Sequence, residues 1–341
     1  MACTCGRCGA TSSAPLLDVA INAAPLAAAR TGVGRYIAGL LDALAAAPPD
    51  GIRARPIFLP GPATRAARGL LKRLPFAYPL ADARRAAILR RERPTVYHET
   101  NHAAPAFRGP LVLTVHDLST LLWPRTQERA RARHFARKLQ GARWAARVIV
   151  PTAAIAEEVV LRLAVPAARV RVIHHGVDSR FSPAAVPRGR FVLYAGDAGP
   201  RKGLDTLRAA LPEGAELKLA GPGHGYVGDD ELIALYRGAA VLVLPSLYEG
   251  FGFPLLEAMA CGTPCIASDD PALVEVSAGA ARHVPRGDAA AFAAALEVAL
   301  DDAGRAAWQA RARTRAAELG WGPVVERWRE LLAALAGARR A

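Results

Sequence analysis

The sequence predicts an α/β protein of two doubly wound domains that face each other across a cleft. The chain has 341 residues, of which 52% are hydrophobic. That length exceeds the ~100–200 residues of one typical domain. Short apolar runs of strand length alternate with stretches of helical spacing, a pattern typical of parallel β-α-β units. Residues 181–190 interrupt this alternation with two prolines and no periodicity, which indicates a linker.

The first domain is predicted to span residues 14–180. Its expected strands are short apolar runs followed by loops, at 16–25, 52–60, 95–99, 111–116, 148–152 and 170–178. Helical spacing is expected at 35–47, 131–146 and 154–164. Residues 1–13 are expected to be a disordered tail. Their three cysteines, Cys3, Cys5 and Cys8, have no nearby histidine to complete a metal site.

The second domain is predicted to span residues 191–320. Its strands are expected at 191–197, 217–221, 240–245 and 265–268. Helices are expected from Leu204, near Glu231, from Pro254 and, after Phe292, to the end of the chain. Each strand ends in Gly, Pro or Ser before its helix, at the edge where open α/β sheets bind ligands.

Positive charge is concentrated in the first half. The net charge is +14; residues 1–180 hold 27 basic and 11 acidic side chains, whereas residues 181–341 hold 17 and 19. A basic half suggests nucleic acid, an anionic membrane or a phosphorylated ligand as partner. Residues 64–93 and 125–147 carry many of these basic side chains, and in 64–93 they are interleaved with apolar ones. They are interpreted as an interfacial element or, alternatively, as amphipathic helices packed on the sheet.

A cytoplasmic location is expected, because no apolar run approaches the ~18 residues of a membrane span and the N-terminus lacks the order of a secretory signal. The five cysteines, an odd number, argue for reduced thiols. Cys261 and Cys265 are interpreted as small buried hydrophobic residues.

Residues 245–269 carry most of the candidate chemistry. Glu249 stands at a strand end, the loop Gly250-Phe251-Gly252 follows, and Glu257 lies about one turn into a helix. Glycines let the backbone approach a ligand, and amides at a helix N-terminus attract phosphate. Two carboxylates beside such a loop can accept hydrogen bonds from hydroxyl groups, which suits a nucleotide-sugar. On spacing alone, Glu249 could instead cap the helix and Glu257 could lie on a solvated face.

The segment Glu249-x7-Glu257 within 245–269 resembles the signature of glycosyltransferase family 4, the retaining GT-B enzymes. Four further segments resemble motifs of that family in the same order: 31–36, 113–118, 174–181 and 193–211. Residues 116–124 are most similar to the mannosyltransferase-like branch. The resemblance implies two Rossmann-like domains, with the helix at 321–338 crossing back onto the first.

The resemblance also implies roles for residues of the second domain. Arg201 and Lys202 would bind the donor diphosphate and stabilise it as the leaving group. Glu257 would hold the ribose hydroxyls. Glu249 would lie beside the transferred sugar, with the amides of Gly250, Phe251 and Gly252 around its hydroxyls and phosphate.

In the first domain the resemblance implies that Gly34 brings its amide to the phosphate and that His116 meets the donor sugar. Alternatively, His116 is a hydrogen-bonded histidine at a strand end. His98 and His102 could line the acceptor cleft or bind a metal. The sequence contains no D-x-D, which disfavours the metal-dependent GT-A type of sugar transferase, and no metal or cofactor is expected. Residues 31–36 lack the Lys-Ser/Thr of a P-loop, which argues against ATP hydrolysis.

The sequence therefore predicts a retaining hexosyltransferase that uses a GDP- or UDP-sugar, with mannose as the leading candidate. A glycan or lipid-linked acceptor, cell-envelope polysaccharide synthesis and docking on the inner face of the cell membrane are expected. No nucleic-acid partner is expected. One alternative is a non-hydrolysing nucleotide-sugar epimerase of the same architecture. A second is a basic membrane- or nucleic-acid-binding protein with an inactive enzyme fold.

Overall fold

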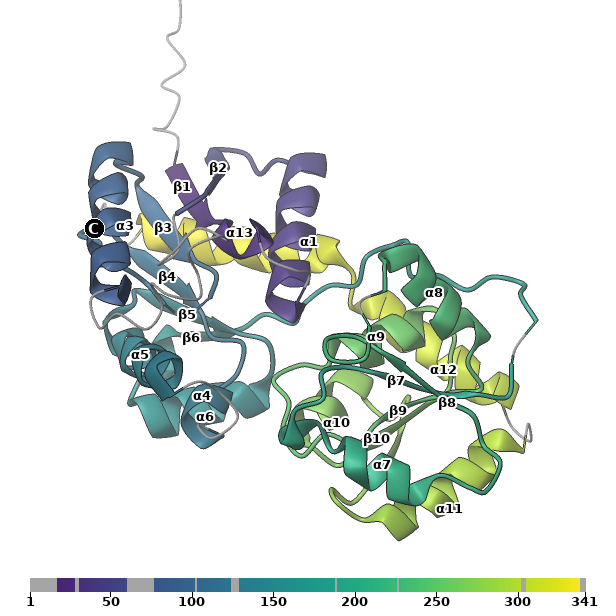
Figure 1. Ribbon diagram of the computed structural model, residues 1–341. Coiled ribbons are helices and arrows are strands. Elements are labelled where there is room, and N and C mark those ends of the chain that lie inside the picture. The colour runs from purple at the N-terminus through teal and green to yellow at the C-terminus, as the bar shows by residue number, and fades with distance from the viewer. Residues whose placement is uncertain are drawn as a thin grey trace, which may run out of the picture.

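The computed structural model describes residues 17–27, 31–59, 77–101, 103–123, 129–187, 189–225, 227–301 and 305–337. Two layered α/β domains lie beside each other (Figure 1). The N-terminal domain is purple to teal, and the C-terminal domain is green to yellow. The tail predicted at 1–13, residues 64–76 of the first basic segment, and His102 lie outside the described residues.

A parallel sheet forms the centre of the N-terminal domain. Its described strands are β1 (Leu17–Asn22), β2 (Ile52–Ile57), β3 (Val96–Glu99), β4 (Leu111–Thr114), β5 (Arg147–Val150) and β6 (Val170–Val172). They pair in the order β2-β1-β3-β4-β5-β6, and every pairing is parallel. The order reverses between β1 and β3, at the kind of switch point beside which α/β sheets bind ligands.

Helices cover both faces of this sheet. The described ones are α1 (Gly32–Ala46), α3 (Ala77–Glu92), α4 (Ser119–Leu122), α5 (Arg129–Leu139) and α6 (Ala153–Leu163). Helix α1 packs Ile37 and Leu40 against one face, and α6 packs Ile155 and Val159 into a separate core on the other. Threonine caps both helices: the Thr31 hydroxyl accepts from the Gly34 amide, and that of Thr152 from the Ile155 amide.

The C-terminal domain repeats the plan. Its described strands are β7 (Val192–Ala195), β8 (Leu217–Ala220), β9 (Val241–Leu244), β10 (Cys265–Ser268) and β11 (Arg282–Val284), all parallel in the order β11-β10-β9-β7-β8. Its described helices are α7 (Leu204–Ala210), α8 (Asp229–Gly238), α9 (Phe253–Ala260), α10 (Pro271–Ser277), α11 (Ala289–Leu300) and α12 (Arg305–Glu318). The strands β7, β9 and β10 are buried along their whole length because helices cover both faces.

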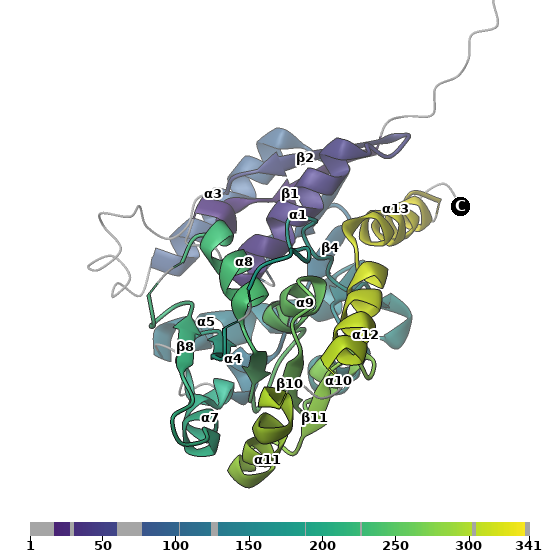
Figure 2. The same cartoon turned by 90° about the vertical axis from the view of Figure 1, so that its right-hand side faces the viewer.

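The last described helix, α13 (Trp321–Gly337), leaves the C-terminal domain and packs on the N-terminal one beside α1 (Figures 1 and 2). Trp321 fills the space beside two glycines: a Cβ on Gly39 would lie 2.1 Å from its indole ring, and one on Gly176 2.6 Å from it. Larger residues at positions 39 and 176 would therefore clash with Trp321 at the start of α13.

Trp328 anchors α13 through a buried chain of hydrogen bonds. Its indole Nε1 donates to His98 Nδ1 at 3.2 Å, and His98 Nε2 lies 2.8 Å from the Thr114 hydroxyl. Tyr36 Oη lies 3.3 Å from the same hydroxyl. Burial lowers the pKa of His98 to about 3, so this imidazole is neutral. Both ring nitrogens of His98 are hydrogen-bonded to buried side chains, Trp328 and Thr114. His98 therefore neither lines a cleft nor binds a metal here.

The structure confirms the predicted fold class of two parallel-sheet α/β domains. Elements α4, α10 and β11 were not among the predicted strands and helices. Cys261 and Cys265 are buried, as predicted. Within the described ranges, no helix is both long and apolar enough to span a membrane.

Replacing Trp328 by Phe should lower the free energy of unfolding by at least about 1 kcal/mol. The change removes the donor to the buried His98 Nδ1 and leaves a cavity under α13. Urea denaturation measures the effect. Trp144→Phe is the matched control, because Trp144 is 80% exposed, and it should stay within about 0.5 kcal/mol of the wild type. Equal stability of both variants would contradict the anchoring role of Trp328.

Candidate active site

The loop from β9 to α9 positions the first carboxylate, Glu249. Gly252 ends this loop with a φ of +88°, and a Cβ there would lie 2.4 Å from Leu273 Cδ2, so glycine is required. Helix α9 then begins at Phe253, with Pro254 in its first turn, where a missing N–H costs nothing. The backbone amide of Glu249 donates to Asp270 Oδ2 at 3.3 Å. Burial and the nearby Glu249 raise the pKa of Asp270 to about 6.

Two cations from the loop after β7 face Glu249. Lys202 forms an ion pair with Glu249 Oε1, which also accepts a hydrogen bond from the Ser246 hydroxyl at 2.8 Å. Arg201 Nη1 lies 3.9 Å from Glu249 Oε2 and donates to the Tyr248 carbonyl at 3.2 Å. Both cations stand in a single 3-10 turn, Pro200–Lys202. The turn ends at Gly203, where a Cβ would lie 2.0 Å from the Pro245 carbonyl oxygen.

The second carboxylate, Glu257, is buried and held from both domains. Tyr236 Oη of α8 donates to Glu257 Oε2 at 2.9 Å, and Arg35 Nη1 of α1 lies 2.9 Å from Oε1. Arg35 also reaches Asp229 at 3.5 Å. Burial raises the pKa of Glu257 to about 7, although the Arg35 guanidinium opposes this shift. The interpretation of Glu257 as a solvated helix-face residue was therefore wrong.

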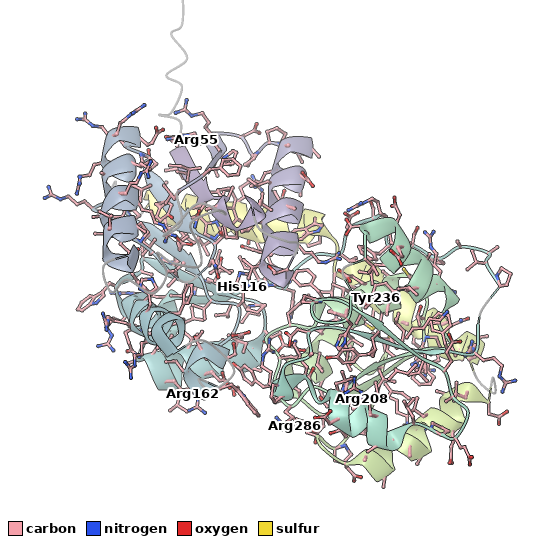
Figure 3. All side chains as sticks on the ribbon, viewed as in Figure 1. Arg55, His116, Arg162, Arg208, Tyr236 and Arg286 are labelled. Carbon is pink, nitrogen blue, oxygen red and sulfur yellow. The ribbon has the colours of Figure 1, made fainter. Side chains whose placement is uncertain are left out.

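His116 follows β4 on the side of the N-terminal domain that faces the C-terminal domain (Figure 3). Its Nε2 lies 2.8 Å from the Thr100 carbonyl oxygen, and its Nδ1 lies 3.2 Å from His175 Nε2. Both ring nitrogens therefore already have protein partners. The backbone of His116 meets the other domain, since a Cβ on Gly250 would lie 2.0 Å from the His116 carbonyl oxygen.

Further contacts join the domains around this point. The Thr152 hydroxyl donates to the Gly250 carbonyl at 3.1 Å. Tyr248 Oη donates to Glu158 at 2.8 Å and accepts from the Leu118 amide at 2.9 Å. These bonds hold the glycine loop of one domain against the loops that follow β4 and β5 in the other.

A cavity of about 370 Å³ lies between the domains. Its walls include the predicted site residues His116, Arg201, Lys202, Glu249, Gly250, Phe251, Gly252 and Glu257. Gly34 is the exception: it lines an adjacent cavity of about 390 Å³, and its amide is already bonded to the Thr31 hydroxyl. Gly32 and Val33 reach the first cavity instead.

The cavity combines groups that suit a phosphorylated, hydroxyl-rich ligand. Arg201 and Lys202 can bind an anion, and Glu249 and Glu257 can accept hydrogen bonds from hydroxyl groups. No group of three or more His, Cys, Asp or Glu side chains that could hold a metal occurs in the part of the chain that the structure describes.

Sequence reasoning assigned no role to Arg35, His175, Tyr248 or Asp270, although all four make polar contacts in or beside the site. The first three lie within the segments 31–36, 174–181 and 245–269; Arg35 and Tyr248 adjoin Gly34 and Glu249, whereas no residue of 174–181 had an expected role. Their contacts cross long sequence separations, so no local pattern could reveal them.

Comparison with known proteins agrees with the fold. Residues 30–181 match the family model described as Glycosyltransferase Family 4, and residues 223–316 match that described as Glycosyl transferases group 1. O-antigen chain mannosyltransferase B of Escherichia coli is 28% identical over 289 residues, covering 72% of this chain and 76% of that protein.

Among solved structures, sucrose-phosphate synthase from Thermosynechococcus elongatus superposes with a TM-score of 0.74 at 23% identity, covering 94% of this chain and 99% of that one. HepE from Anabaena, solved in complex with UDP-glucose, gives a TM-score of 0.69 at 17% identity and covers 93% and 99%. At these identities the two structures show a shared fold.

Glu257 should titrate near pH 7, in contrast to an exposed glutamate, whose pKa is ~4.3. Carboxyl ¹³C NMR of glutamate-labelled protein measures this, and the signal that disappears in Glu257→Gln identifies it. In Arg35→Met the midpoint should move to higher pH, because the cation that favours the ionised carboxylate is gone. Arg208→Met, which changes an exposed arginine paired with Asp205, is the control. A midpoint near 4.5 in the wild type would contradict the burial of Glu257.

Proposed function

Because the chain belongs to glycosyltransferase family 4 and has the GT-B fold, we propose that it transfers a sugar from a nucleoside diphosphate sugar to a glycan or lipid-linked acceptor. Mannose is the proposed sugar, since the E. coli relative named above is a mannosyltransferase. One observation carries the proposal: the cavity brings Arg201, Lys202 and Glu257 from one domain opposite His116 from the other.

The C-terminal domain would hold the nucleotide. Glu257 would accept hydrogen bonds from the ribose hydroxyls, and its ionised form is the better acceptor. Arg201 and Lys202 would bind the diphosphate. Negative charge grows on the diphosphate as the glycosidic bond breaks, so these cations would stabilise the transition state more than the ground state. The amides of the loop Gly250-Phe251-Gly252 would contact the phosphate and the sugar.

The transferred sugar would lie between Glu249 and His116. The Glu249 carboxylate is held by Ser246 and Lys202, which suits a hydroxyl-binding group better than an attacking nucleophile. We therefore propose front-side attack within an ion pair, with retention of configuration. The bond from the anomeric carbon to the phosphate oxygen breaks, the acceptor oxygen bonds to that carbon on the same face, and its proton passes to the departing diphosphate.

The decisive test compares two lysines. Lys202→Gln should lower kcat by about 10²–10³-fold, because one cation opposite the leaving diphosphate is lost. Lys218→Gln should leave kcat unchanged, because Lys218 contacts Glu216 and Phe191, away from the cavity. Release of sugar and nucleotide from a panel of GDP- and UDP-sugars gives the assay. Unaltered kinetics in Lys202→Gln would refute the site, and an epimerised donor as the product without acceptor would indicate the epimerase.

Metal-independent transfer is part of the proposal, since Arg201 and Lys202 can supply the positive charge that other sugar transferases draw from a divalent cation. Activity should survive dialysis against EDTA. Complete loss that Mn²⁺ restores would show that a metal is required.

We also propose that the N-terminal domain docks on anionic membranes, from the cytoplasmic side. Residues 64–76 lie outside the described residues, but an exposed patch lies in and near the second basic segment. This patch comprises Arg143, Trp144 and Arg169; Trp144 is 80% exposed, and Arg169 donates to the Arg143 carbonyl. Arg162, on helix α6, which packs against the turn Gln140–Trp144, points outward from the domain (Figure 3). An exposed indole among arginines suits a membrane interface.

The wild-type protein should co-sediment with vesicles rich in anionic lipid at low salt and should be released at high salt, because screening weakens charge attraction. Trp144→Ala should weaken the binding. Trp308 does not serve as the control position, because its indole donates a hydrogen bond to the Ala280 carbonyl within the C-terminal domain. Val298→Ala, at an exposed apolar position of that domain, is the matched control. Equal binding to anionic and neutral vesicles would disprove docking by charge.

A further inference from the structure

A second histidine, His175, contacts His116 inside the cavity wall. His175 stands in the loop after β6, is 1% exposed, and places Nε2 3.2 Å from His116 Nδ1. It lies 59 residues from His116 in the sequence, so the fold alone brings the two rings together. Both histidines line the cavity that holds Arg201 and Lys202.

The backbone carbonyl of Thr100 determines which ring nitrogens of the two histidines carry a proton. The Thr100 carbonyl can only accept, so His116 Nε2 must carry a proton and donate to it. Burial lowers the pKa of both imidazoles, which keeps them neutral. His116 Nδ1 is then an acceptor, and His175 Nε2 must be its donor. The remaining atom, His175 Nδ1, is buried without a hydrogen-bond partner among the described residues, so no acceptor draws the proton there.

The ring of His175 is also packed by both domains. It stacks on Phe253 with centroids 5.2 Å apart and planes 11° from parallel, and it lies 4.8 Å from the Phe251 ring. Tyr36 of α1 lies 4.6 Å away on the N-terminal side. Phe251 belongs to the glycine loop and Phe253 begins α9. His175 thus contacts His116 and the glycine loop at the same time.

We propose that His175 is a positioning residue, which holds the His116 imidazole in one orientation and one tautomer toward the sugar site. A half-turn of the His116 ring exchanges each nitrogen with a carbon. With the Thr100 acceptor on one side and the His175 donor on the other, a single orientation satisfies both nitrogens. Without His175 one anchor is left, and Nδ1 is an unsatisfied acceptor whose cost the ring can relieve by rotating.

This inference rests on the proposed function for its kinetic consequence. If His116 meets the transferred sugar, loosening its ring should lower kcat, while nucleotide affinity should change little because Glu257, Arg201 and Lys202 make those contacts. Its structural consequence does not rest on that function and appears in the protein without substrate.

The structural test is a long-range ¹H–¹⁵N spectrum of protein labelled in histidine, with signals assigned by His116→Gln and His175→Phe. In the wild type both rings should show one proton, on Nε2. In His175→Phe, which keeps an aromatic ring beside Phe251 and Phe253, the His116 Nδ1 signal should shift, and the ring should show a second tautomer or exchange broadening. An unchanged His116 pattern in His175→Phe would overturn the proposal.

The kinetic test compares two substitutions at position 175, Gln and Asn, whose side-chain amides extend to different distances from Cβ. The amide nitrogen of Gln is as many bonds from Cβ as His Nε2, whereas that of Asn matches His Nδ1. His175→Phe and His175→Asn should lower kcat by about tenfold or more with less than about twofold change in nucleotide Kd, and His175→Gln should recover most of the rate. Equal rates in the Gln and Asn variants would overturn the positioning role. If the wild type bound no nucleotide-sugar, the proposed function would fail while the NMR result would still decide the role of His175.

Discussion

The close approach of Gly250 to the His116 carbonyl is the contact on which the rest of the site depends. A single methyl group at position 250 would lie 2.0 Å from that oxygen, so the glycine allows two backbones from different domains to meet. Thr152 then bonds the Gly250 carbonyl, and Tyr248 bridges Leu118 and Glu158. These bonds bring the carboxylates and cations of one domain to the same cavity as the histidines of the other.

Burial shifts the ionisation of the charged groups that line this cavity. Glu257 is 3% exposed, and burial alone would favour its neutral form. Arg35, reaching across from α1, opposes that tendency at 2.9 Å. The ionisation of a group in the C-terminal domain is therefore coupled to a side chain of the N-terminal domain. Glu249 is likewise held by Lys202 and Ser246 and is not left as an isolated buried charge.

The strands and most helices could be predicted because the chain repeats a local period. Buried parallel strands are continuous apolar runs such as Val241–Leu244, and α1 carries apolar residues on one face after a threonine cap. The cluster Glu249, Gly250 and Glu257 was predictable for a similar reason, since it lies within nine consecutive residues. Gly34 was predicted in the loop before a helix at 35–47, but it lies in the first turn of α1. Its amide bonds the Thr31 hydroxyl, and Gly32 and Val33 line the cavity instead.

The sequence by itself determined the alternation of strands and helices, the glycine loop before α9 and the residue types available for binding a phosphorylated sugar. These depend on neighbours a few residues apart. The tertiary structure decided which nitrogen of His116 carries a proton, which cation meets Glu257, and that His98 supports α13 at Trp328. Each of those contacts joins residues 16 to 230 positions apart. These contacts form only when the two sheets and helix α13 pack together, because hydrogen bonds and buried ion pairs depend on distance in space and not on separation along the chain.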